Sequence, residues 1–133
     1  MAGTFKFELV SPERILESAD VLEVLVPGGD GDFTVLPGHA PVISTLRPGV
    51  LVTKKADGSS SRIYVNGGFC EVAPESLTVL AEKAHDVASM DAATINSHLA
   101  AAKAVLEGDA DDDMRYAAHT AITHLNSLNG MPN

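Results

Sequence analysis

The residue best placed for acid–base chemistry is a histidine held in a rigid loop. His39 stands between Pro37 and Pro41, and proline fixes the backbone on either side of it. Its imidazole could act in catalysis only with a carboxylate or a nucleophile positioned beside it. The sequence identifies no such partner, so we interpret His39 as a residue that braces the loop by a hydrogen bond or contacts another protein.

Two acidic segments resemble the beginnings of calcium sites. Residues 28–33 start like a glycine-rich calcium repeat, but Phe33 replaces the aspartate that the repeat needs. Residues 109–113 start like an EF-hand loop, but Met114 and Thr120 stand where glycine and a bidentate glutamate are required. The sequence therefore predicts no metal site in either segment.

The remaining reactive side chains form no catalytic or metal-binding pattern. His119 and His124 are five residues apart and His98 lies in another segment, whereas metal-binding pairs on helices prefer a spacing of four. We expect all three to be solvated helix residues. Cys70 lies in an apolar run and is expected to be a small buried hydrophobe. No phosphate-binding P-loop occurs, so we expect neither catalytic residues nor a cofactor.

Composition narrows the class of partner. The chain has 133 residues, 45% of them hydrophobic, and a formal net charge of −9, which disfavours binding to nucleic-acid phosphates. A single cysteine excludes an internal disulfide and fits a reducing compartment. Neither a signal peptide nor an apolar run long enough to span a membrane is recognisable. We therefore expect a soluble cytoplasmic chain.

The first two thirds of the sequence predict short strands. Apolar residues alternate over 5–10, and further apolar runs end at glycine- or proline-containing turns every 8–12 residues, a pattern typical of a β-sandwich or barrel. Asn66-Gly67 predicts a tight hairpin turn. The expected strands are 5–10, 21–26, 33–36, 43–46, 50–53, 63–65, 69–72 and 77–80.

After residue 89 alanine dominates and the apolar period changes to that of a helix. Asp91 is placed to cap a first helix that ends near Gly108. The acids at 109–113 favour the start of a second helix because they face the positive end of its dipole. The short connection predicts an antiparallel helical hairpin, and we divide the chain into a β-domain, 1–88, and a hairpin, 89–133.

Several segments, in this order and spacing, closely resemble the epsilon subunit of F-type ATP synthases. They read VPGGDGDFTVLPGHAP at residues 26–41, LRPG at 46–49, YVNGGFCEV at 64–72 and VLAEKA at 79–84. The resemblance covers nearly the whole β-part, and the trailing helical hairpin agrees with it.

The resemblance implies a non-catalytic rotor component. In that family an N-terminal ten-stranded antiparallel β-sandwich binds the gamma subunit and the ring of membrane c subunits, and an antiparallel two-helix hairpin follows it. The subunit couples proton-driven rotation to ATP synthesis, at the cytoplasmic face of the bacterial plasma membrane. The hairpin can also reach the alpha/beta head.

The resemblance also assigns roles to residues of the glycine-rich loop. Asp32 matches the acidic position that meets a basic residue of the c ring. The expected contacts with the c ring or gamma are made by Asp30, Gly31, Asp32 and His39. The expected structural residues are Pro27, Gly28, Pro37, Gly38, Pro41, Gly67 and Gly68.

The hairpin departs from the family's pattern. Nucleotide-binding members carry an arginine and an alanine three and four residues after the aspartate that matches Asp91, but Thr94 and Ile95 occupy these positions. A bidentate phosphate partner is therefore missing, and we interpret Asp91 as a helix cap. From residue 90 onward six acids face only Lys103 and Arg115, a charge of −4. Because inhibitory hairpins rely on basic residues, we expect weak inhibition or none.

Two other functions are compatible with a small β-domain followed by helices: a free-standing binding module and a small enzyme. A free-standing β-sandwich that captures a ligand or peptide would show no stoichiometric association with gamma. A small hydrolase or metalloenzyme would need paired catalytic groups, which the sequence does not supply.

Overall fold

Alternation of apolar and polar residues builds the first strand, β1 (Phe5–Val10). Phe5, Phe7 and Leu9 are buried, whereas Lys6 between them is exposed, because successive side chains of a strand point to opposite faces. The structure is a computed structural model that describes residues 3–129. The predicted domain limits at residues 1 and 133 lie outside this range.

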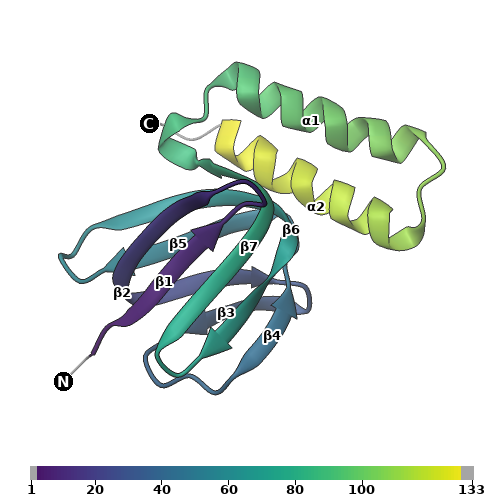
Figure 1. Cartoon of the computed structure of the whole chain (residues 1–133). Helices are drawn as coiled ribbons and strands as arrows, with labels where there is room; N and C mark the ends of the chain where they lie inside the picture. Colours follow the sequence, from purple (N-terminus) through teal and green to yellow (C-terminus); the bar gives the residue numbers. More distant parts are fainter. Residues whose placement is uncertain (1–2, 130–133) are drawn as a thin grey trace.

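Seven strands form the β-part of the described chain (Figure 1). They are connected in the order β1-β7-β6-β5-β2-β3, with β4 paired to β6 and β1 also paired to β2. The side chains enclosed by this arrangement form the main core, which is built largely from valine and leucine. After β1 the strands are β2 (Ile15–Gly28), β3 (Gly31–Val35), β4 (Val42–Thr45), β5 (Gly49–Lys55), β6 (Ser60–Ala73) and β7 (Ser76–Asp86).

The predicted count of ten strands is not confirmed, because long strands serve two parts of the sandwich. The first half of β2 pairs with β1 and its second half with β3 and β5. In the same way β6 pairs first with β5 and then with β4. The predicted hairpin turn at Asn66-Gly67 is wrong: Gly67 and Gly68, with φ of 78° and 118°, lie within β6 while it stays paired with β7.

The sandwich is also not wholly antiparallel. β1 and β7 run parallel and pair from Lys6 opposite Ser76 to Val10 opposite Leu80. The other strand pairs are antiparallel. Parallel strands need no tight turn between them, so a sequence pattern based on turns gives no sign of this pair.

The helical hairpin consists of α1 (Ala92–Glu107) and α2 (Asp112–Asn129), joined to β7 by a short 3-10 turn, η1 (Val87–Ser89). The predicted cap is confirmed, because Asp91 Oδ1 accepts the Thr94 N–H at 2.8 Å. Asp111 caps α2 in the same way through the Met114 N–H. Met114, in the first turn of α2, is half exposed.

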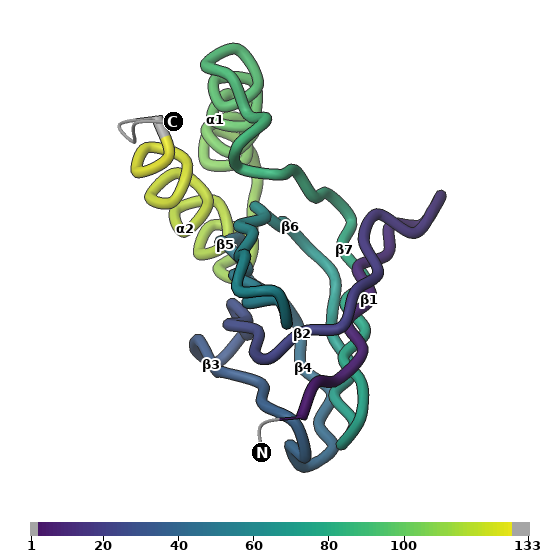
Figure 2. The backbone as a smooth tube through the Cα atoms, turned by 90° about the vertical axis from the view of Figure 1, so that its left-hand side faces the viewer, coloured from purple at the N-terminus to yellow at the C-terminus, as the bar shows by residue number. Residues whose placement is uncertain are grey.

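The hairpin is docked against the sandwich, and α2 lies beside β5 (Figures 1 and 2). A second apolar core fills this contact. Tyr64 of β6 is fully buried in it, and Val50 of β5 packs against its edge. The helices contribute Ile95, Leu99, Ala121, Leu125 and Leu128, and Met90 precedes them.

Candidate functional site

The glycine-rich loop begins with a two-residue turn that joins β2 to β3. Gly28 and Gly31 face each other in register, so Gly29 and Asp30 form the tip. Gly31 has φ of 140°, a conformation that side chains with a Cβ rarely adopt. A Cβ on Gly28 would lie 2.8 Å from the Phe33 ring. Glycine is therefore required on both sides of the turn.

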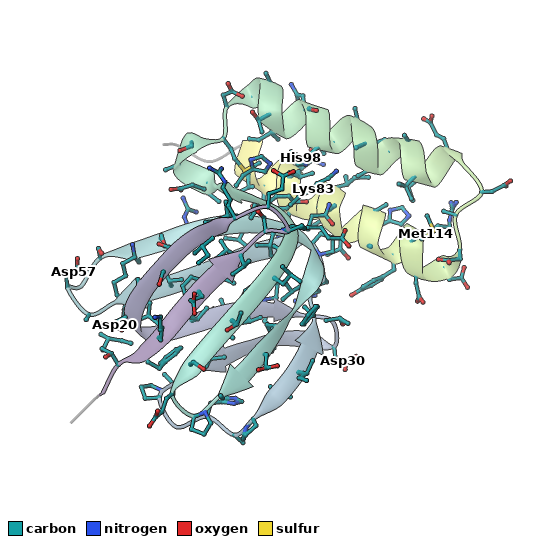
Figure 3. The ribbon with its side chains drawn as sticks, viewed as in Figure 1. Asp20, Asp30, Asp57, Lys83, His98 and Met114 are labelled. Atoms are coloured by element: carbon teal, nitrogen blue, oxygen red, sulfur yellow. The ribbon has the colours of Figure 1, made fainter. Side chains whose placement is uncertain are left out.

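Backbone hydrogen bonds fix this turn to the segment that follows β4. The Gly29 N–H donates to Thr45 O at 2.8 Å, and the Arg47 N–H donates to Pro27 O at 3.0 Å. Pro27 is buried beneath the turn, and Asp30 is exposed at its tip on the rim of the sandwich (Figure 3). The turn is thus a fixed projection that presents a carboxylate.

Asp32 is not a free carboxylate, because the Arg47 guanidinium donates a hydrogen bond to its Oδ1. The Asp32 side chain is 52% exposed and that of Arg47 is 24% exposed. The hydrogen bond to Asp32 raises the pKa of Arg47 above its ordinary value, and the nearby Tyr116 side chain of α2 acts in the same direction. Arg47 therefore contacts both the turn and the docked hairpin.

Sequence reasoning did not select Arg47 or Tyr116 as site residues. Arg47 lies 15 residues after Asp32, and only the pairing of the segment after β4 with β2 brings the two together. Tyr116 belongs to the helical part, and no sequence pattern places that part beside the loop. Neither contact has a local sequence signal.

His39 is braced within its own loop. Its Nδ1–H donates to Ala40 O at 2.7 Å, and its ring lies against Phe33 with centroids 6.3 Å apart. Gly38, with φ of 82°, donates its N–H to Pro74 O at 2.8 Å. The predicted bracing hydrogen bond is confirmed. Asp32 is the second residue of β3 and His39 follows the other end of that strand, so the two lie at different places on the rim.

An exposed apolar surface lies beside this loop, which we call the β4 face. β4 is an edge strand that pairs with β6, and Ile43 on it is 70% exposed. Pro41 and residues 71–73 line a shallow groove along the same strand. Phe69 of β6 is 44% exposed and lies on the same side of the β4–β6 pair as Ile43, because its partner Thr45 is two residues from Ile43. Ile43 and Phe69 are the apolar members of the β4 face.

The sequence predicted a strand here but could not show that its apolar side chains are exposed. An apolar run of four residues looks the same whether the strand is buried or lies at an edge. An apolar patch with an unpaired strand edge is a surface that proteins usually cover with a partner. The β4 face therefore joins the glycine-rich turn as a candidate binding surface.

The other predicted structural residues support this region from outside it. Gly68 O accepts the Leu46 N–H at 3.0 Å and so ties the bend of β6 to the segment that carries Arg47. A Cβ on Gly68 would lie 1.9 Å from Leu80 O. At Gly67 the Glu82 carboxylate occupies the space above the backbone. Pro37 is exposed in the His39 loop.

The hairpin residues of the degenerate nucleotide motif have a structural role. The hydrogen bond from the Thr94 N–H lowers the pKa of Asp91, as expected for a carboxylate that caps a helix.

Cys70 is fully buried, as predicted, and burial raises the pKa of its thiol. His119 is exposed, but His98 is not a solvated residue: it contacts His85 and Tyr64 beneath α1.

Within residues 3–129 no three His, Cys, Asp or Glu side chains cluster in a way that could hold a metal ion. None of the helices in that range combines the length and apolar character that crossing a membrane requires.

Comparison with known proteins identifies the family. The family model for the ATP synthase Delta/Epsilon chain, beta-sandwich domain, matches residues 4–87. Proteins described as ATP synthase epsilon chain from Brucella canis and Brucella abortus are each 44% identical over 130 residues, which cover 98% of this chain and 96% of the relative.

Two solved structures share the fold. A cryo-EM structure of the Euglena gracilis mitochondrial ATP synthase, comprising OSCP, F1 and c-ring, contains a chain that matches with a TM-score of 0.73 at 20% identity, over 95% of this chain and 79% of that one. A central stalk and c-ring structure from the Tetrahymena thermophila mitochondrial ATP synthase matches with a TM-score of 0.63 at 11% identity, over 94% and 96%. The chain, a non-catalytic subunit, therefore belongs to the family of ATP synthase epsilon chains.

Proposed function

We propose that this chain is a rotor subunit of the central stalk, which binds gamma and the c ring and transmits proton-driven rotation toward ATP synthesis in the catalytic head. Membership of the epsilon family supports the proposal, as do the solved structures that contain F1, a central stalk and a c-ring. The chain would act at the cytoplasmic face of the plasma membrane, held there by the complex. No cofactor is needed for this role.

The observation that carries the proposal is the β4 face. Its apolar side chains Ile43 and Phe69 are 70% and 44% exposed in the isolated chain, and burying such surface is the main favourable contribution to protein association. The edge of β4 also offers unpaired backbone groups to a neighbouring chain. We assign the β4 face to gamma, because an apolar surface suits a partner that stays bound during rotation.

The glycine-rich turn is assigned to the c ring. Asp30 and Gly31 project at its tip, and Asp32 stands beside them with half of its side chain open to solvent. Arg47 already neutralises part of the Asp32 charge, so a basic residue of the c ring would share this carboxylate with Arg47. The contact sets the relative position of the two surfaces, because exposed ion pairs contribute only about 0–1 kcal/mol each. His39, beyond the other end of β3, would make a separate contact.

We further propose that residues 1–88 and 89–133 act as separate functional units. The family model ends at residue 87, close to the η1 turn between β7 and α1. The hairpin would regulate weakly, because its charge of −4 opposes contact with acidic surfaces of the alpha/beta head.

Replacing Ile43 tests the assignment to gamma. Ile43→Asp should abolish stoichiometric copurification with gamma, since it places a charge in the centre of the β4 face. Ile15→Asp is the matched control, because Ile15 is 59% exposed on β2 and should tolerate the charge. Unchanged association of the Ile43→Asp chain, with a correctly folded sandwich, would refute the assignment.

Crosslinking tests the assignment to the c ring. A cysteine in place of Asp32 should form a disulfide with a cysteine placed in the polar loop of the c subunit. Asp57→Cys is the control, since Asp57 lies in the exposed turn between β5 and β6, away from Asp30 (Figure 3). Cys70 is buried and stays silent. Equal crosslinking from both positions, or from neither in an intact complex, would contradict the assignment.

A further inference from the structure

Two histidines meet between the sandwich and the hairpin. His98 of α1 lies edge-on to His85 of β7, with ring centroids 4.8 Å apart and planes at 74°. The Tyr64 ring of β6 is also edge-on to His98, at 5.8 Å. Figure 3 shows Lys83 and His98 close together where the hairpin meets the sandwich. Two potential cations, His85 and Lys83, therefore face the imidazole of α1.

The remaining neighbours of His98 supply little compensating charge. The same region forms a cavity of about 390 Å³, into which α2 contributes only Met114, Ala117, Ala118 and Ala121. From α1 itself the cavity is lined by Ala101, Ala102 and Val105, and from β6 by Asn66. None of these side chains can be charged.

Two acids lie nearby, but neither is among the charges that act on His98, which are His85 and Lys83. Glu82 lines the cavity, and its carboxylate lies over the backbone of Gly67. Asp86 Oδ1 accepts the Ala88 N–H and caps the η1 turn. A proton on His98 would therefore be repelled by Lys83 and His85, with no carboxylate charge acting on it.

We propose that mild acidification releases α1 from the sandwich, because protonated His98 is repelled by Lys83 and His85 across the α1–β7 contact. The hairpin would thus be held by a pH-sensitive latch. The inference concerns the docking of the chain's own hairpin, and it holds whichever partner the β4 face binds.

The direction of the pH effect follows from the docked environment. Burial, the charge of His85 and that of Lys83 lower the pKa of His98 below its ordinary value of 6.5. Docking therefore favours the neutral imidazole. The docking equilibrium is at its strongest above pH 6.5 and weakens as the pH falls through 6.5 toward the lowered pKa, because the undocked helix binds the proton more readily.

Distances between spin labels in the full chain test the latch. Cysteines replacing Ala104 on α1 and Thr78 on β7 carry the labels, since both positions are exposed and Cys70 is buried. At about pH 7.5 we expect a single narrow distance distribution, and at about pH 5.5 a several-fold larger population outside it. His98→Gln should keep the narrow distribution at both pH values.

Two further variants separate the latch from a general acid effect. His119→Gln removes an exposed histidine of α2 and should leave the pH response intact. Lys83→Gln should weaken the response, because less repulsion remains. A response that persists in His98→Gln, no response in the unaltered chain, or loss of β-sheet circular dichroism over the same pH range would each overturn the proposal.

Discussion

Gly68 is the residue whose replacement should damage the sandwich most. A Cβ there would lie 1.9 Å from Leu80 O, and the backbone has φ of 118°. Gly68→Ala must therefore displace β6 from β7, and we expect a loss of about 3 kcal/mol or more in the free energy of unfolding. Urea titration measures this loss.

Gly58→Ala provides the matched control for Gly68. Gly58 also has positive φ, 91°, but nothing lies within 4 Å of its added Cβ. Gly58→Ala should lower the free energy of unfolding by about 1–2 kcal/mol, because it adds only the strain of a left-handed backbone. Equal losses at the two positions would show that the contact with Leu80 is readily relieved and that the bend of β6 is less constrained than we infer.

The ion pair between Asp32 and Arg47 should contribute little to stability on its own. Both side chains reach solvent, and we expect a coupling energy of about 0.2–1 kcal/mol. A double-mutant cycle with Asp32→Asn and Arg47→Gln in the isolated chain measures it. The coupling should fall further at high salt, because exposed pairs are screened. A salt-independent coupling would mean that the pair is shielded more than its exposure indicates.

At the scale of elements, Tyr64 links β6 to the hairpin and makes its docking sensitive to alkaline pH. Burial raises the pKa of Tyr64 to about 12 from an ordinary value of 10.0. The docked state favours the neutral phenol, so docking is at full strength below pH 10.0 and is lost as the pH rises from there toward about 12.

Replacing the phenol by a phenyl ring should remove this alkaline response. In a Tyr116→Phe chain, which keeps Tyr64 as its single tyrosine, tyrosinate absorbance should appear near pH 12. Tyr64→Phe should keep the hairpin docked across that range, as measured by label distances. Ionisation of Tyr64 near pH 10 would show that the hairpin does not shield it in solution.

The helices were more predictable from sequence than the strands, because their signals are local. Asp91 is recognisable as a helix cap because the N–H that it accepts, that of Thr94, lies only three residues further along the chain. The bend at Gly67 and Gly68 was mistaken for a turn, since those glycines satisfy the rule for a hairpin equally well. Pairing with β7 on both sides of the bend, from Ile63 to Ala73, keeps β6 continuous, and that pairing is not encoded in the dipeptide.

In the candidate site, too, the features with local sequence signals were predictable and those that depend on tertiary contacts were not. The glycine-rich turn and the braced His39 follow from residues close together in sequence, and both were predicted. The exposure of Ile43 and the contact of Arg47 with Tyr116 depend on where separate elements lie. Periodicity identifies an apolar strand but not its position at the edge of the sheet.

On the scale of the whole molecule, a few residues connect the glycine-rich turn of the sandwich to the docked hairpin. The glycine-rich turn lies on the sandwich, yet Arg47 behind it reaches α2. A partner that draws Asp32 away from Arg47 would alter the same guanidinium that contacts Tyr116. The two halves of the chain are thus connected at the rim of the sandwich as well as through the apolar core around Tyr64.

Removing the hairpin should change the activity of the assembled complex only slightly. The charge of −4 beyond residue 90 gives the helices few basic groups with which to hold an acidic surface of the head. ATP hydrolysis by complexes carrying the full chain, or a chain ending at Ser89, measures the effect. A several-fold activation on truncation would contradict the prediction.

A charge-altered hairpin makes this comparison decisive. Asp112→Lys with Asp113→Lys brings the charge of the segment to zero and places basic groups at the exposed start of α2. If charge limits inhibition, this chain should slow hydrolysis relative to the unaltered one, and truncation of the altered chain should restore the rate. If hydrolysis stays unchanged in both chains, the docking of the hairpin, rather than its charge, keeps it away from the head.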